Sequence, residues 1–161
     1  MTMPVKSTNS SIPLLQQLRV DYPALSFDSS NHFSWHAGTQ HITYRADSLE
    51  STEGTWALLH ELGHAQLEHT DFESDVELLK IEAAAWLKAQ ELAHAYDVQI
   101  EDDYVQDSLD SYRDWLHVRS TCPSCQNRSL QQSRHSYRCH NCHAEWSVSR
   151  SRLCRPYRRA S

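Results

Sequence analysis

The sequence of 161 residues lacks any long apolar run, any signal-peptide pattern, repeats and low-complexity tracts. A membrane-spanning helix needs about 20 mostly apolar residues, and no stretch approaches that length. The first twenty residues, MTMPVKSTNSSIPLLQQLRV, contain neither a continuous apolar core nor a small-residue cleavage site. We therefore expect a cytoplasmic protein with reduced cysteines and no membrane partner.

Acidic residues are almost missing from the C-terminal part of the chain. Residues 119–161 contain 9 arginines and one acid, Glu145, whereas residues 1–118 contain 6 lysines and arginines against 20 acids. Such a difference between two parts of a chain indicates two units with different partners. The alternative is that the basic part docks on the acidic body of its own chain.

Hydrophobic periodicity predicts an α+β fold, with a small antiparallel sheet followed by three main helices. A short helix ends at Pro23, and the aromatic and β-branched residues of 25–45 are broken by turn signals into two or three short antiparallel strands. The three main helices are marked by apolar residues at helical spacing. They are expected from about Asp47, where Glu50 completes a capping box, from Asp75 to Tyr96 with Leu79, Ala83, Trp86 and Leu87 on one side, and from Asp103 to Val118.

The first main helix contains His60-Glu61-Leu62-Gly63-His64. Residues four apart share a helix face, so His60 and His64 can hold one ion, and zinc lowers the pKa of a bound water to about 7. Glu61 is placed to take the proton of that water as it attacks a carbonyl. Gly63 permits close approach of another element. The alternative is an amphipathic helix that carries two surface histidines.

A hydrolytic zinc site needs three protein ligands and one open position. The position six after His64, where a metzincin has its third histidine, is Thr70. Glu82, on the next helix, is the better candidate, and Trp86 one turn later would wall the site. Glu77 and Asp75 are alternatives to Glu82.

The segments WALLHELGHAQLEH and IEAAAWLKAQELA resemble the gluzincin peptidases, more narrowly the ImmA/IrrE-type peptidases and the minigluzincins. These share HELGH and a glutamate followed by alanine, two variable residues and an aromatic. The resemblance spans roughly residues 30–100 and implies a zincin-like fold, with His60, His64 and Glu82 as zinc ligands and Glu61 as general base. It also implies that activity can be latent. Lys80 departs from the acid that family members often have at that position.

Two Cys-x-x-Cys pairs, Cys122/Cys125 and Cys139/Cys142, are separated by 13 residues. Two such pairs on a short hairpin place four thiolates around one structural zinc, which makes a zinc ribbon. Tyr137, Trp146 and Val148 would form its small core. Disulfides are the alternative pairing, and His140 or His143 could substitute as ligands. Cys154 is left over, either as a plain thiol or as a ligand that blocks the first zinc.

We interpret the chain as a metallopeptidase with two zinc ions, one catalytic and one structural, acting on a protein or peptide such as a transcriptional regulator. Arginines among aromatics around the ribbon suit nucleic-acid binding, with protein docking and self-inhibition as the alternatives. A binding protein whose HELGH site is structural or blocked is the alternative. A crosslink protease of SprT type is only an architectural analogy, because His69 and His94 fit its third histidine poorly. The predicted parts are a disordered N-terminus (1–11), a peptidase domain (12–118), a zinc ribbon (119–150) and a basic tail (151–161).

Overall fold

The computed structural model describes residues 13–149 and the backbone of 158–160. Within these residues, four helices and two small sheets confirm the α+β class. The predicted disorder of residues 1–11 lies outside the described residues. The helices are α1 (Leu14–Asp21), α2 (Thr52–Gln66), α3 (Asp75–Ala93) and α4 (Asp102–Ser120), with 3-10 turns η1 (Ala37–Thr39) and η2 (His94–Tyr96). The strands are β1 (Ser26–Ser29), β2 (Ser34–His36), β3 (His41–Tyr44), β4 (Leu130–Ser133), β5 (Ser136–Arg138), β6 (Glu145–Val148) and β7 (Arg158–Ala160).

The first sheet has the order β1-β3-β2 and is mixed. β2 pairs antiparallel with β3, as predicted, but β1 pairs parallel with β3, with Phe27 opposite Ile42. The chain leaves β1, forms β2 at the far edge and returns through η1 to the centre. Strand alternation predicts which face is buried but carries no signal for strand order, which is why a purely antiparallel sheet was expected.

Two serine caps set the start of the helices that carry the histidines and the glutamate. The Ser51 hydroxyl accepts a hydrogen bond from the Gly54 amide at 3.0 Å, and Ser74 accepts one from the Glu77 amide at 3.2 Å. The expected capping box at Asp47 is not used, because α2 begins after Ser51 and Asp47 instead pairs with Arg45. α3 ends at Ala93 and continues as η2 to Tyr96, which agrees with the predicted extent.

The packed face of α3 differs in part from the predicted one. Trp86 is buried, but Leu87 is 69% exposed. The buried positions are Leu78, Glu82, Ala85, Trp86, Ala89 and Ala93. Half of these positions are alanines, which allow α2 and α3 to approach closely.

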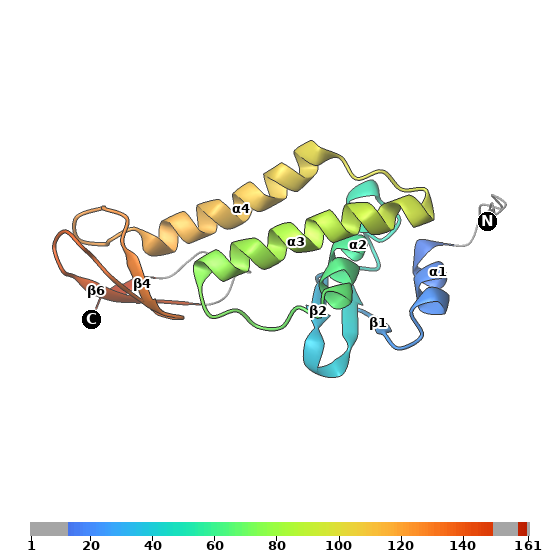
Figure 1. Ribbon diagram of the computed structural model, residues 1–161, viewed down its shortest axis with the longest axis horizontal. Helices are drawn as coiled ribbons and strands as arrows, with labels where there is room; N and C mark the ends of the chain where they lie inside the picture. The colour runs from blue at the N-terminus through green and yellow to red at the C-terminus, as the bar shows by residue number, and fades with distance from the viewer. Residues whose placement is uncertain (1–12, 150–157, 161) are drawn as a thin grey trace, which may run out of the picture.

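Figure 1 shows α3 and α4 running antiparallel, with the second sheet at one end and α2, the first sheet and α1 gathered near the other. The second sheet has the order β4-β5-β6-β7. β7 falls within the predicted basic tail (151–161), and it pairs with β6. Within the part of the chain that the structure describes, no helix is long and apolar enough to cross a membrane.

Candidate metal centres

His60 and His64 from α2 converge with Glu82 from α3. The two Nε2 atoms lie 3.0 Å apart, and Glu82 carboxylate oxygens lie 3.1 Å from His60 Nε2 and 3.5 Å from His64 Nε2. Donor atoms held tetrahedrally at zinc-ligand bond lengths lie about 3.3 Å from one another. The three donors therefore fit one ion of this size without rearrangement.

The three side chains are buried, with exposures of 6% for His60, 7% for His64 and 6% for Glu82. Burial opposes a charge on Glu82, but hydrogen bonds from His60 and His64 outweigh it and lower the pKa of Glu82. Burial also works against protonation of His64, yet the adjacent Glu82 and Glu61 raise its pKa above the usual value. A carboxylate this deep needs a cation beside it, either a protonated histidine or a metal ion.

Aromatic rings surround the cluster. The Trp86 ring packs against the His60 ring with 4.2 Å between the centroids and a tilt of 30°, which confirms the predicted wall beside the glutamate. His64 Nδ1 lies 2.9 Å from Nδ1 of His69, a hydrogen bond in which either ring can donate. The carbonyl of His69 accepts a hydrogen bond from the Trp35 indole at 2.9 Å, so His69 is fixed at its backbone. His69 is not part of the ligand cluster, and its place beside His64 depends on how the chain turns after α2.

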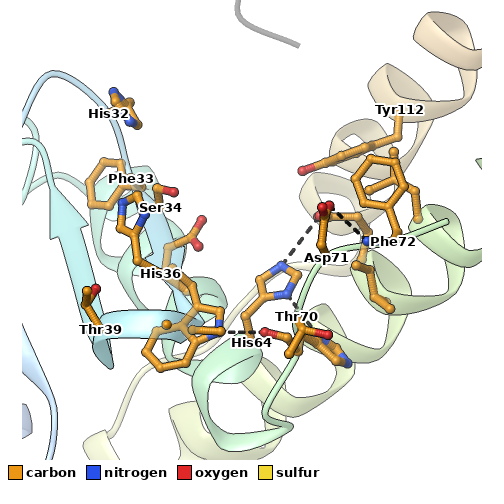
Figure 2. A pocket seen from close by; sticks show the side chains of 18 residues that line it. His32, Phe33, Ser34, His36, Thr39, His64, Thr70, Asp71, Phe72 and Tyr112 are labelled. Carbon is orange, nitrogen blue, oxygen red and sulfur yellow. Dashed lines mark hydrogen bonds and ion pairs between the residues drawn. The ribbon is translucent and has the colours of Figure 1, made fainter. Parts of the chain in front are cut away.

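A cleft of about 880 Å³ opens beside the cluster and is lined by Glu61, His64 and Glu82. Figure 2 shows Phe33, Ser34 and His36 on one side of this cleft and Asp71, Phe72 and Tyr112 on the other. The first side is the edge strand β2 with Phe33 just before it, and the second combines the loop after α2 with α4. Glu61 is thus placed at a cleft next to the three candidate ligands.

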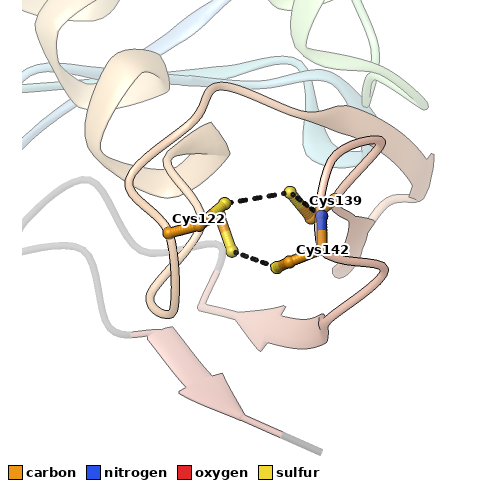
Figure 3. A group of neighbouring side chains, drawn as sticks. Cys122, Cys139 and Cys142 are labelled. Carbon is orange, nitrogen blue, oxygen red and sulfur yellow. Dashed lines mark hydrogen bonds between the residues drawn. The ribbon is translucent and has the colours of Figure 1, made fainter.

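The four predicted cysteines form a second cluster (Figure 3). Cys122 Sγ lies 3.6 Å from Cys142 Sγ, and Cys125 Sγ lies 3.4 Å from Cys139 Sγ. Four sulfurs bound tetrahedrally to zinc at about 2.3 Å lie about 3.8 Å apart, so the cluster fits one ion. All four are free thiols in the structure.

The backbone around the cysteines forms two matching turns. The amides of Gln126 and His143 donate to the carbonyls of Cys122 and Cys139. Both residues adopt the left-handed conformation, with φ of 64° and 62°. Glycine usually stands after such a knuckle for this reason.

The small core predicted for the cysteine module is present. Tyr137 and Trp146 are buried and stack with 5.5 Å between ring centroids. Val148 and the buried Cys122 and Cys139 complete this core.

None of the alternative ligands that the structure describes belongs to either cluster. Glu77 is exposed, and Asp75 contacts the cysteine module rather than the histidines. Within the described residues, His140 and His143 are not part of the cysteine cluster. Cys154 lies outside the described residues.

Two arginines of the basic part contact the acidic body of the chain. Arg119 is 1% exposed, its Nε lies 3.6 Å from Asp75, and Tyr137 donates a hydrogen bond to the same carboxylate. Arg134 pairs with Asp71 at 2.6 Å. The alternative in which basic residues dock on their own chain therefore holds for these two side chains.

Comparisons of the chain with protein-family models, with curated proteins and with solved structures find no match. The two clusters are possible metal-binding sites compatible with zinc.

Proposed function

We propose that the protein is a zinc-dependent metallopeptidase of gluzincin type, with His60, His64 and Glu82 as ligands. The observation that carries this proposal is the convergence of the three buried donors beside a cleft that Glu61 also lines. A purely structural ion site has no need of a cleft with a free carboxylate next to it, because such sites are closed by four protein ligands.

A zinc ion in this site would supply a Lewis acid that polarises a peptide carbonyl and acidifies a water molecule. Glu61 follows His60 in α2 and lines the cleft without belonging to the ligand cluster. Its carboxylate is the group that accepts the proton of the attacking water and passes it to the leaving nitrogen. Trp86 and His69 hold the rings of His60 and His64 in place while this happens.

The test is the Glu61→Gln variant, compared with wild type on a mixture of unstructured peptides and proteins. We expect both forms to contain two zinc ions and only wild type to cleave, because the amide cannot accept the proton. The matched control is Glu91→Gln, an exposed acid on α3 paired with Lys88, which should cleave like wild type. Equal cleavage by wild type and Glu61→Gln would refute the proposal.

The rival is a regulatory binding protein whose histidine site is structural or blocked by its own chain. It predicts no cleavage by any form and four protein ligands on the first ion.

We further propose that the cysteine module recruits the enzyme to a partner, which can be nucleic acid. Arg138 is exposed on β5, and more arginines follow in the sequence. Binding through phosphate contacts must weaken as salt rises. Affinity for single- or double-stranded DNA that is independent of salt would leave a protein partner as the remaining choice.

A further inference from the structure

Arg134 stands in the turn between β4 and β5 and reaches across to the loop after α2. Its Nε and Nη2 both donate to the carbonyl of Phe72, at 3.0 and 2.7 Å. The same guanidinium lies 2.6 Å from the carboxylate of Asp71 and 3.4 Å from that of Glu73. One side chain therefore contacts three consecutive residues that are 61 or more positions away in the sequence.

Two of these residues belong to the wall of the cleft that faces β2. Asp71 and Phe72 line the cleft, and Figure 2 shows them beside Tyr112. The loop lies outside any helix or strand, and two of its amides donate locally: the Phe72 amide to Asp71 and the Glu73 amide to Glu77. A loop of this kind is easily opened unless a distant group holds it.

Arg134 is itself fixed from the other side. Its carbonyl accepts a hydrogen bond from Nη2 of the buried Arg119 at 2.9 Å. The hairpin that presents it leads from the first pair of cysteines to the second, since β5 ends at Arg138 and Cys139 follows. An ion in the cysteine cluster would lock the base of this hairpin, and Arg134 is at its tip.

We propose that Arg134 is a positioning residue through which the cysteine module holds the 71–73 loop, whose Asp71 and Phe72 line the cleft. The module thereby shapes the cleft beside His60, His64 and Glu82, in addition to binding any outside partner. Zinc in the cysteine cluster then determines the affinity of the cleft for its substrate. The effect on substrate rests on the proposed peptidase function; the effect on the loop does not.

The test is amide hydrogen exchange of the full chain, with zinc present and no substrate. Arg134→Ala should raise exchange at Phe72 and Glu73 by about five- to tenfold, as expected for two charge-assisted hydrogen bonds weakened by partial exposure. Exchange within α2 should stay unchanged. The matched control is Arg138→Ala, which removes an exposed arginine of the same module whose partner, Glu145, is also in the module.

A second variant tests the link to the cysteines. Cys142→Ser should raise exchange at the same two loop amides, because the hairpin is no longer closed at its base. Unchanged loop exchange in Arg134→Ala would overturn the positioning role, and unchanged loop exchange in Cys142→Ser would overturn the link to the cysteine cluster.

Kinetics then separate this proposal from the peptidase proposal. If peptides are cleaved, Arg134→Ala should raise KM several-fold with kcat nearly unchanged, since Arg134 contacts no reacting group. If no form cleaves while loop exchange responds as described, the peptidase proposal fails and the positioning role stands. A fall in kcat with unchanged KM would contradict the role in substrate binding.

Discussion

Gly63 of α2 lies against the backbone of Ala85 in α3. A Cβ atom on Gly63 would be 2.5 Å from the Ala85 carbonyl oxygen, closer than any real contact of that kind. Gly63 precedes His64, and Ala85 precedes Trp86 and follows Glu82 by three residues. The missing side chain is therefore what lets α3 bring its carboxylate to the two imidazoles.

Gly63→Ala should destabilise the protein and weaken zinc binding at the histidines. The obstacle is backbone, so the helices must move apart, which we expect to cost about 1–2 kcal/mol after the better helix propensity of alanine is counted. Chemical denaturation measures the free energy of unfolding. Gly38→Ala is the control, because nothing lies within 4 Å of its Cβ, and it should change stability by less than about 0.5 kcal/mol. Equal effects of the two substitutions would argue against the close approach.

His69→Ala should lower zinc affinity at the histidine site about 10- to 100-fold while leaving the cysteine site intact. If His64 binds through Nε2, its Nδ1 carries the proton and donates to His69 Nδ1, which fixes the ring. Competition with a fluorescent zinc chelator gives the affinity. His94→Ala, an exposed histidine at the end of α3, should behave as wild type. An unchanged affinity in His69→Ala would mean that the contact is incidental.

The effect of zinc on stability should grow as pH rises through the neutral range. The raised pKa of His64 stabilises the ion-free protein below about pH 6.5, and this contribution is lost as pH rises through the raised value. The lowered pKa of Glu82 adds to the stability of the folded protein above about pH 4.5. This contribution is lost only as pH falls through the lowered pKa. Zinc binds His64 only in its unprotonated form. The stabilisation by zinc therefore increases over the pH range in which the stabilising His64–Glu82 ion pair is lost.

Melting temperatures with and without zinc, recorded between about pH 5.5 and 8, measure this effect. His64→Ala retains the cysteine cluster, and subtracting its curve leaves the contribution of the histidine site. A difference that stays constant over this range would contradict the coupling between His64 and Glu82.

The substitution His143→Gly should stabilise the cysteine module. His143 has a φ of 62°, which is unfavourable for a residue with a side chain, and its amide bond to Cys139 would be kept. We expect a gain of about 0.5–1 kcal/mol, seen as tighter zinc binding by the cysteines. Ala144→Gly is the matched control, because Ala144 has no positive φ and packs against the module core. That variant should bind zinc less tightly.

Local patterns in the sequence were sufficient to predict much of the first site. The spacing of His60 and His64, the small Gly63 and the position of Trp86 one turn after Glu82 are all consequences of helical periodicity. The preference for Glu82 over Glu77 as the third ligand rests on which helix face each occupies and on the family resemblance. The structure brings Glu82 to the histidines because the small residues of α3 pack on α2, which is a property of two helices together.

Long-range features were not predictable in the same way. Two examples are the parallel pairing of β1 with β3 and the contact of Arg134 with Phe72. In both, the contacting segments are distant in the chain, and local sequence patterns do not predict which segment contacts which. Exposure of Leu87 has a similar cause, since apolar residues flank both sides of α3 and only packing decides which side is covered.

The presence of a three-ligand zinc site is tested most directly by anomalous diffraction at the zinc absorption edge from crystals of the full chain. We expect two peaks per chain, one among the four cysteine sulfurs and one about 2.0–2.2 Å from His60 Nε2, His64 Nε2 and a Glu82 oxygen, with its fourth position open to the cleft. A single peak at the cysteines, or a second ion that Glu82 does not touch, would contradict the three-ligand site.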